Sequence, residues 1–121
     1  MEKKELAEKI ADLMIEKKAQ DVIILDLRKL TSIVDFFVIC SANSDTQVKA
    51  ISNYIAEETR KIGEKPWHNE GINNLSWVLL DYIDVVVHIF LEDTRRFYNL
   101  EGLWGDAEII KVEDEQEVRK A

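Results

Sequence analysis

A few acidic and hydroxyl side chains could support metal-assisted phosphoryl transfer. Asp81 and Asp84 lie three residues apart, and Ser41 and Asp45 stand near the start of a predicted helix. Two-metal enzymes need carboxylates that bridge both ions, and a minimal nucleotidyltransferase supplies them from a D-x-D pair on one strand face. The chain has no D-x-D, and Asp81 and Asp84 are expected on either side of a turn. A divergent metal-dependent nucleotidyltransferase built on these four residues is therefore an alternative hypothesis only.

Side chains suited to nucleophilic catalysis or metal binding are equally scarce. Cys40 lies inside an apolar run, where cysteine is usually a buried and unreactive residue. His88 lies in a predicted strand and shares a face with Val86 and Phe90, so we expect a structural role for it, with Asp81 as a candidate partner. The second histidine lies in a loop with no neighbouring ligand, and this scatter does not form a zinc site. The sequence predicts no cofactor, no metal and no enzymatic activity.

The aromatic and arginine side chains of the second half of the chain indicate a protein interface. They are of the types enriched at interface hot spots, namely Trp77, Tyr82, Arg95, Arg96, Tyr98 and Trp104. Some must belong to the core, and we expect Phe97, Leu100 and Trp104 to pack on the sheet from one helix face. Trp77 and Tyr82 flank a predicted hairpin, whose outer face can stay uncovered in an antiparallel sheet. The spacing therefore favours a protein-docking face on the hairpin.

Hydrophobic periodicity predicts the elements that position these residues. Apolar residues at helical spacing predict a helix over 3–18, and Ser44, Gln47 and Gly63 predict the start cap and the end of a second helix. The remaining expected elements are strands at 22–27, 36–40, 77–82 and 85–91, a loop at 64–74 with a short edge strand, a helix from 92, and a short strand at 109–112. This order predicts an α/β fold, a mixed β-sheet with helices packed on it.

Length and charge limit the class of protein. The 121 residues, with a formal net charge of −8, fit one domain over 1–121, with a core at about 3–107 and a charged tail at 108–121. A single cysteine, no apolar signal core and no apolar run near the roughly 20 residues of a membrane span predict a cytoplasmic protein without membrane contact. The acidic balance predicts little direct nucleic-acid contact and favours a basic protein partner.

Three segments resemble the ribosomal silencing factor family, also called Iojap-like. They are Thr31–Ser41 continuing through Asn43-Ser44-Asp45 and Gln47-Val48, then Trp77–Tyr82 with Asp84–His88, and lastly Thr94–Glu101 running on to Leu103–Asp106. With Glu70-Gly71 they cover most of residues 21–106 in the family's order. The chain departs from the family's usual glycine at Ala42 and Ile83. Because a branched residue disfavours positive φ, Ile83 argues against a tight two-residue turn in the hairpin.

The resemblance implies a fold with nucleotidyltransferase-like topology that lacks the catalytic aspartates. It also implies binding to the large ribosomal subunit through its ribosomal protein fourteen, a steric block of subunit joining, repression of translation, and a homodimer when the protein is free. We expect the contact or contact-supporting residues to be Trp77, Asp81, Tyr82, His88, Arg95 and Tyr98. Among them, Trp77 and Tyr98 would be anchors, Asp81 would meet a basic side chain, and Arg95 would donate paired hydrogen bonds. A dimeric adaptor for another basic protein is the remaining alternative.

Overall fold

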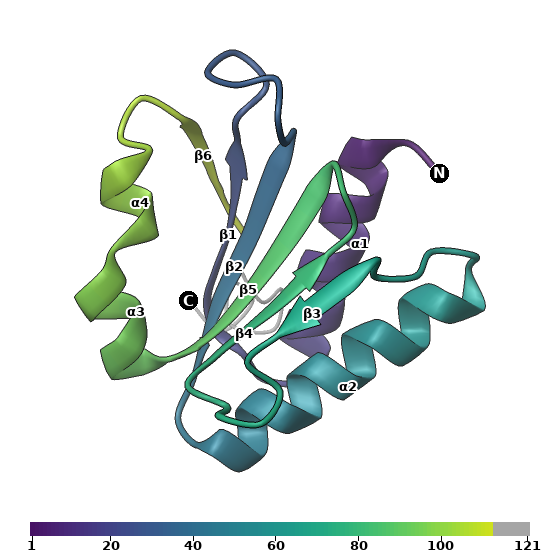
Figure 1. The fold of residues 1–121 in the computed structure, drawn as a ribbon, viewed down its shortest axis with the longest axis vertical. Coiled ribbons are helices and arrows are strands. Elements are labelled where there is room, and N and C mark those ends of the chain that lie inside the picture. The colour runs from purple at the N-terminus through teal and green to yellow at the C-terminus, as the bar shows by residue number, and fades with distance from the viewer. Residues whose placement is uncertain (113–121) are drawn as a thin grey trace, which may run out of the picture.

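The computed structural model describes residues 1–112 and forms a six-stranded sheet with helices on both faces (Figure 1). The helices are α1 (Lys3–Glu16), α2 (Asp45–Lys61), α3 (Glu92–Tyr98) and α4 (Leu100–Leu103). The strands are β1 (Gln20–Asp26), β2 (Phe36–Ala42), β3 (His68–Glu70), β4 (Trp77–Asp81), β5 (Val85–Leu91) and β6 (Glu108–Lys111). The predicted mixed α/β fold is confirmed, as are the short edge strand in the 64–74 loop and the strand near 109–112.

The strand order is β3-β4-β5-β2-β1-β6, and every neighbouring pair is antiparallel except β2 and β5. The parallel pair lies at the centre of the sheet, and α2, β3 and β4 form the long connection between β2 and β5 that parallel strands require. Helices α1 and α2 cover one face and enclose the main core, which includes Ile10, Phe36, Val38, Ile55 and Ile89. On the other face, α4 contributes Leu100 to a second, smaller core (Figure 1).

Helix α2 begins and ends where the sequence predicts. The hydroxyl of Ser44 accepts a hydrogen bond from the backbone N–H of Gln47 at 3.2 Å, and Gln47 Oε1 accepts from Asn43 N–H at 2.8 Å. These two contacts satisfy amides that the helix itself leaves unpaired. Gly63 follows the helix with a φ of 84°, the left-handed conformation expected after a helix end. Both capping predictions are confirmed.

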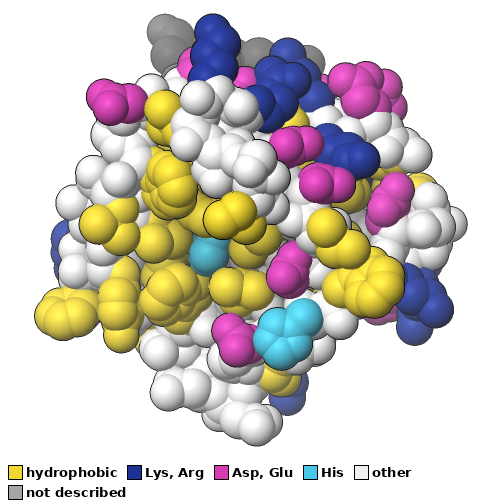
Figure 2. Space-filling model, turned by 45° about the horizontal axis from the view of Figure 1, so that its top comes forward, with side chains coloured by type: hydrophobic (Ala, Val, Ile, Leu, Met, Phe, Trp, Pro, Cys, Tyr) yellow, Lys and Arg dark blue, Asp and Glu magenta, His cyan; other side chains and the backbone are white. Residues whose placement is uncertain are grey.

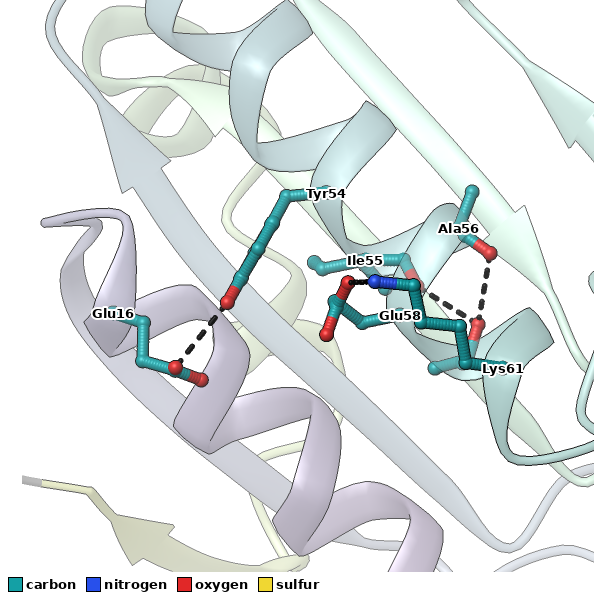
Figure 3. Close-up of polar contacts among 7 residues, drawn as sticks. Glu16, Tyr54, Ile55, Ala56, Glu58 and Lys61 are labelled. Carbon is teal, nitrogen blue, oxygen red and sulfur yellow. Dashed lines mark hydrogen bonds and ion pairs between the residues drawn. The ribbon is translucent and has the colours of Figure 1, made fainter.

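Polar side chains fasten α2 to α1 and brace its last turns, as the close-up in Figure 3 shows. The hydroxyl of Tyr54 donates to Glu16 Oε1 at 3.2 Å, across the contact between the two helices. Lys61 pairs with Glu58 one turn earlier at 2.7 Å. The buried hydroxyl of Thr59 donates to the carbonyl of Ile55 at 2.8 Å, so this polar group is satisfied inside the core.

The turn between β4 and β5 differs from the sequence-based expectation. Three residues, Tyr82 to Asp84, lie between β4 and β5, and the backbone N–H of Tyr82 donates to the carbonyl of Val85 at 2.8 Å. Ile83 adopts a φ of 76°, the conformation that its branched side chain was expected to prevent. Asp81 Oδ1 accepts from Ile83 N–H at 2.7 Å, and Asp84 N–H donates to the Tyr82 carbonyl at 3.0 Å. These hydrogen bonds offset the backbone strain at Ile83, so the expectation that its branched side chain would avoid a positive φ was wrong.

The helix expected from residue 92 is divided into α3 and α4 at Asn99. Asn99 has a φ of 46°, and its side-chain oxygen accepts from Gly102 N–H at 3.2 Å to cap α4. The break rotates the second half relative to the first, so the expected common face does not form. Leu100 and Trp104 pack against the second core as predicted, whereas Phe97 is 82% exposed. The prediction that Phe97 packs on the sheet is wrong.

Candidate protein-docking surface

Where the sheet is formed by the hairpin strands β4 and β5, one of its two faces is not covered by any described helix. Side chains along β4 alternate strictly, with Val78 and Leu80 buried under α2 while Trp77, Leu79 and Asp81 are half-buried on the opposite face. The register places Val86 of β5 opposite Asp81, and Phe37 of β2 opposite Val86. We call the surface formed by Phe37, Trp77, Leu79, Asp81 and Val86 the open face. Figure 2 shows hydrophobic side chains gathered in a broad field on one face of the molecule, bordered by acidic groups.

The two short helices explain why this surface ends where it does. Helices α3 and α4 cover the neighbouring part of the same sheet face, where Leu25, Ile39 and Phe90 are fully buried. Beyond them, the side chains of Trp77, Leu79 and Val86 on this face are only half-buried. Tyr98 at the end of α3 is 48% exposed and borders the open face beside Trp77. The open face is thus a sheet surface with one rim built by a helix.

Trp77 occupies the junction between the sheet and that rim. Its indole stacks on the buried ring of Phe90, with centroids 4.8 Å apart, and lies 4.8 Å from the ring of Tyr98. The indole Nε1–H donates to Nδ1 of His88 at 3.0 Å. These contacts hold a large aromatic side chain in one place while part of its surface stays exposed, which suits an interface anchor.

His88 is buried below the open face and is held in its neutral form. Its side chain is 4% exposed, and burial lowers its pKa to about 3. Because Nδ1 accepts from the Trp77 indole, the neutral ring carries its proton on Nε2. Nε2 has no hydrogen-bond partner within residues 1–112, and an unsatisfied buried donor costs about 1–3 kcal/mol. The candidate partnership with Asp81 is wrong, because the carboxylate of Asp81 binds the turn at Ile83.

Tyr82 does not lie on the open face. It is five residues after Trp77, an odd spacing that places its side chain on the opposite side of the sheet. There it is 7% exposed in the main core, and its hydroxyl lies 2.8 Å from Thr59 Oγ1 of α2. Burial raises the pKa of Tyr82. Tyr82 is therefore buried and not on an exposed hairpin face beside Trp77, and in the described chain it joins the hairpin to α2. A contact-supporting role for Tyr82 stays a prediction.

Arg95 likewise uses its hydrogen bonds inside the protein. Its Nη1 donates to the carbonyl of Asp21 at 2.7 Å and to Ser41 Oγ at 3.0 Å. Its Nε lies 3.4 Å from Glu101 Oε2 of α4, and the residue is 9% exposed. Arg95 Nε and Nη1 thus make contacts within the described residues, and the expectation that Arg95 donates paired hydrogen bonds to a partner stays a prediction. Arg95 fixes α3, and with it Tyr98, to the ends of β1 and β2.

Carboxylates border the apolar part of the open face. Asp81 ends β4 on this face, and the pairing of β3 with β4 places His68 beside Asp81 and Glu70 beside Leu79. His68 Nε2 lies 3.3 Å from Glu70 Oε1, and both side chains are largely exposed. An apolar centre with an acidic border matches a partner that has apolar side chains surrounded by lysine or arginine.

A family described as "Ribosomal silencing factor during starvation" matches residues 1–121 of the chain. The chain belongs to this ribosomal silencing factor family. It is 40% identical over 113 residues to the ribosomal silencing factor of Halalkalibacterium halodurans, covering 93% of this chain and 97% of that one. It is 42% identical over 98 residues to the ribosomal silencing factor of Bacillus subtilis, covering 81% and 83% of the two chains. A crystal structure of a Chromobacterium violaceum protein superposes with a TM-score of 0.84 at 35% identity, over 87% of this chain and 88% of that one.

Membership of the ribosomal silencing factor family confirms the resemblance seen in the sequence. It supports a ribosomal silencing role, which is a regulatory function rather than a catalytic one. Between residues 1 and 112, no helix has the length and apolar character needed to cross a membrane.

The fold does not bring together the residues of the nucleotidyltransferase hypothesis. Ser41 and Asp45 lie at the end of β2 and the start of α2, whereas Asp84 lies beside the start of β2, where its backbone carbonyl accepts from the N–H of Phe36. A strand of this length separates the two groups by on the order of 15–20 Å. Burial also raises the pKa of Cys40 to about 12, so its thiol stays protonated. In this silencing-factor fold these groups are not placed for joint chemistry.

Sequence reasoning missed three members of the open face, namely Phe37, Leu79 and Val86. Each has an ordinary apolar side chain, so residue type alone does not mark it as a surface residue. The available signal was the alternation along β4 and β5, because Leu79 shares its face with Trp77 and Val86 shares its face with His88. Which face lacks a helix depends on where α3 and α4 pack, and that is a tertiary property.

Proposed function

We propose that this chain is a cytoplasmic ribosomal silencing factor that docks its open face on the large ribosomal subunit, at ribosomal protein fourteen. Seated there, it blocks the small subunit from joining and so represses translation. The observation that carries the proposal is the open face itself, an ordered aromatic and aliphatic surface on a chain whose relatives are named ribosomal silencing factors.

The composition of the open face supports a protein partner. Trp77 and Tyr98 present large aromatic surfaces, and Phe37, Leu79 and Val86 provide half-buried apolar area around them. Aromatic anchors surrounded by apolar contacts are the usual centre of a protein interface. Docking on a partner would remove this area from water, which stabilises a complex by about 25 cal/mol for each Å² of apolar surface buried.

Charge favours a basic partner over direct contact with RNA. The chain has 24 acidic and 16 basic residues, and Asp81 and Glu70 stand on the same sheet face as Leu79. A carboxylate border attracts lysine and arginine side chains and repels phosphate groups. The proposed binding therefore proceeds through a basic ribosomal protein, with little contact to the RNA backbone.

The free protein is proposed to be a homodimer. Trp77 and Tyr98 leave an apolar surface in contact with water when no ribosome is bound, and a second copy would cover it. Light scattering coupled to gel filtration measures the mass directly. A mass of one chain across the concentrations used in the cell would overturn this part of the proposal.

Density-gradient sedimentation with purified subunits tests the function. The protein is mixed with isolated large subunits at near-physiological salt, and small subunits are then added. We expect the protein to migrate with the large subunit and the peak of joined ribosomes to decrease. If the protein stays at the top of the gradient, the proposal fails for this chain.

A matched pair of variants locates the docking surface. Leu79→Glu places a charge at the centre of the open face, where the side chain is half-buried and makes no polar contact that would be lost. Ala50→Glu adds the same charge on the exposed side of α2, across the sheet from the open face. We expect Leu79→Glu to lose co-sedimentation and Ala50→Glu to retain it. Equal binding by both variants would place the interface elsewhere.

A further inference from the structure

We propose that His88 is a positioning residue for the docking surface, because it fixes which edge of the Trp77 indole the open face presents to its partner. The inference rests on the proposed docking function and concerns the same surface. It assigns His88 an action through Trp77, without direct contact to the partner.

The contacts of Trp77 divide into those that tolerate a ring flip and one that does not. Stacking on Phe90, with an interplanar angle of 30°, presents a flat apolar ring to either face of the indole. The contact with the neighbouring ring of Tyr98 likewise does not depend on which way the indole is turned. The hydrogen bond from indole Nε1–H to His88 Nδ1, at 3.0 Å, is directional and exists in one ring orientation only. His88 therefore selects between orientations that stacking alone leaves close in energy.

His88 is itself held in place. The register of the sheet sets it between Ile39 of β2 and Leu79 of β4, and the ring of Phe37 meets its imidazole edge-on with centroids 4.6 Å apart. It is almost fully buried, so its Nδ1 accepts a hydrogen bond without competition from water. A fixed acceptor below a half-exposed donor is an arrangement that orients the donor.

Orientation of Trp77 matters for docking because the indole has an asymmetric outline. Trp77 is half-buried, lies beside Tyr98 at the rim, and shares the open face with Leu79 on β4. Rotating the indole by 180° about its bond to Cβ would exchange the positions of its five-membered and six-membered rings. This rotation would change the shape of the open face. If Trp77 already has its bound orientation in the free protein, association does not have to include the entropy cost of ordering that side chain.

Hydrogen exchange of the Trp77 indole proton tests the orientation in the free protein. Nitrogen-15 NMR resolves the three tryptophan indole signals, and Trp77→Phe assigns the one that disappears. His88→Asn places an amide oxygen near the position of Nδ1, whereas His88→Gln extends its amide toward the position of Nε2. We expect slow exchange in the wild type and in His88→Asn, and exchange at least about tenfold faster in His88→Gln. Similar exchange rates in the two variants would overturn the proposal.

A double-mutant cycle on binding to isolated large subunits tests the path of the effect. We expect His88→Gln to weaken binding about tenfold in the wild-type background and less than about twofold in Trp77→Phe, which has no indole N–H to orient. An equal loss in both backgrounds would show that His88 acts independently of Trp77, and the inference would be wrong. If the wild type does not bind large subunits, the proposed function fails, and indole exchange still decides whether His88 orients Trp77.

Discussion

Arg95 on α3 donates a 3.0 Å hydrogen bond to Ser41 at the end of β2, 54 residues earlier in the chain. Together with the bond to the carbonyl of Asp21, this contact fastens a seven-residue helix that has no side-chain cap at its start. Tyr98 ends that helix and borders the open face. The rim of the docking surface thus depends on an arginine that does not itself reach the surface.

Replacing Arg95 is expected to destabilise the fold. Arg95→Met leaves Ser41, Asp21 and Glu101 without their shared donor, and the free energy of unfolding should fall by about 2 kcal/mol or more. Denaturant unfolding followed by far-UV circular dichroism measures the loss. Arg96→Met is the matched control, because Arg96 pairs with Asp93 and Glu92 at the exposed surface of the same helix and should change stability by less than about 0.5 kcal/mol. Equal losses would show that the buried contacts of Arg95 contribute no more to stability than the exposed ion pairs of Arg96.

Tyr82→Phe separates a core role from a contact role. The substitution removes the hydroxyl that lies 2.8 Å from Thr59 Oγ1, and Thr59 keeps its bond to the Ile55 carbonyl. We expect a loss of about 1 kcal/mol in unfolding free energy and unchanged binding to large subunits. Reduced binding by a variant of undiminished stability would instead support the sequence-based assignment of Tyr82 to the interface.

His88 should make stability depend on pH in mildly acidic solution. Burial lowers its pKa from about 6.5 to about 3, so the unfolded chain binds a proton that the folded chain excludes. Stability is therefore fully present above pH 6.5 and falls as the pH drops toward 3, with a limiting slope of about 1.4 kcal/mol per pH unit. Denaturant midpoints measured between pH 7 and pH 4.5 test this.

The control for the pH series is His88→Leu, which should flatten the slope in that interval. Asp26, whose pKa is lowered by its hydrogen bonds with Arg28, also loses its stabilising charge in acid. The stability that Asp26 contributes is lost only as the pH falls below about 3.8, which is outside the interval measured. An unchanged slope in His88→Leu would assign the acid sensitivity to another group.

Ile83→Gly is expected to stabilise the protein. Ile83 adopts a φ of 76° in the hairpin turn and its side chain is 49% exposed, so glycine relieves strain at the loss of little packing. A gain of about 0.5–1 kcal/mol, or a rise of a few degrees in melting temperature, is expected by calorimetry. A lower melting temperature would mean that the exposed isoleucine packs better than its surroundings indicate.

The local parts of the fold were predictable from the sequence because their causes are local. The cap at Ser44 and Gln47, the left-handed Gly63, and the paired strands of the hairpin all follow from neighbouring residues. The placement of Tyr82 was predictable as well, since five residues separate it from Trp77 and alternation sends the two side chains to opposite faces. The error lay in treating both aromatic residues as one surface.

Other features depend on contacts between distant residues. The burial of Arg95 comes from Asp21 and Ser41, which no pattern around residue 95 reveals. The division of α3 from α4 rests on Asn99, a residue type that tolerates positive φ but does not require it. The uncovered state of Leu79 follows from where those two short helices pack, so the extent of the open face required the structure.

The two outermost strands of the sheet are also its shortest, with three residues in β3 and four in β6. A sheet that displays an apolar surface is prone to polymerise when a long unpaired edge allows strands of other copies to add to it. Here the edges supply few free backbone groups as a template. The protein can consequently keep the apolar open face available for a partner while its short edge strands limit growth into cross-β aggregates.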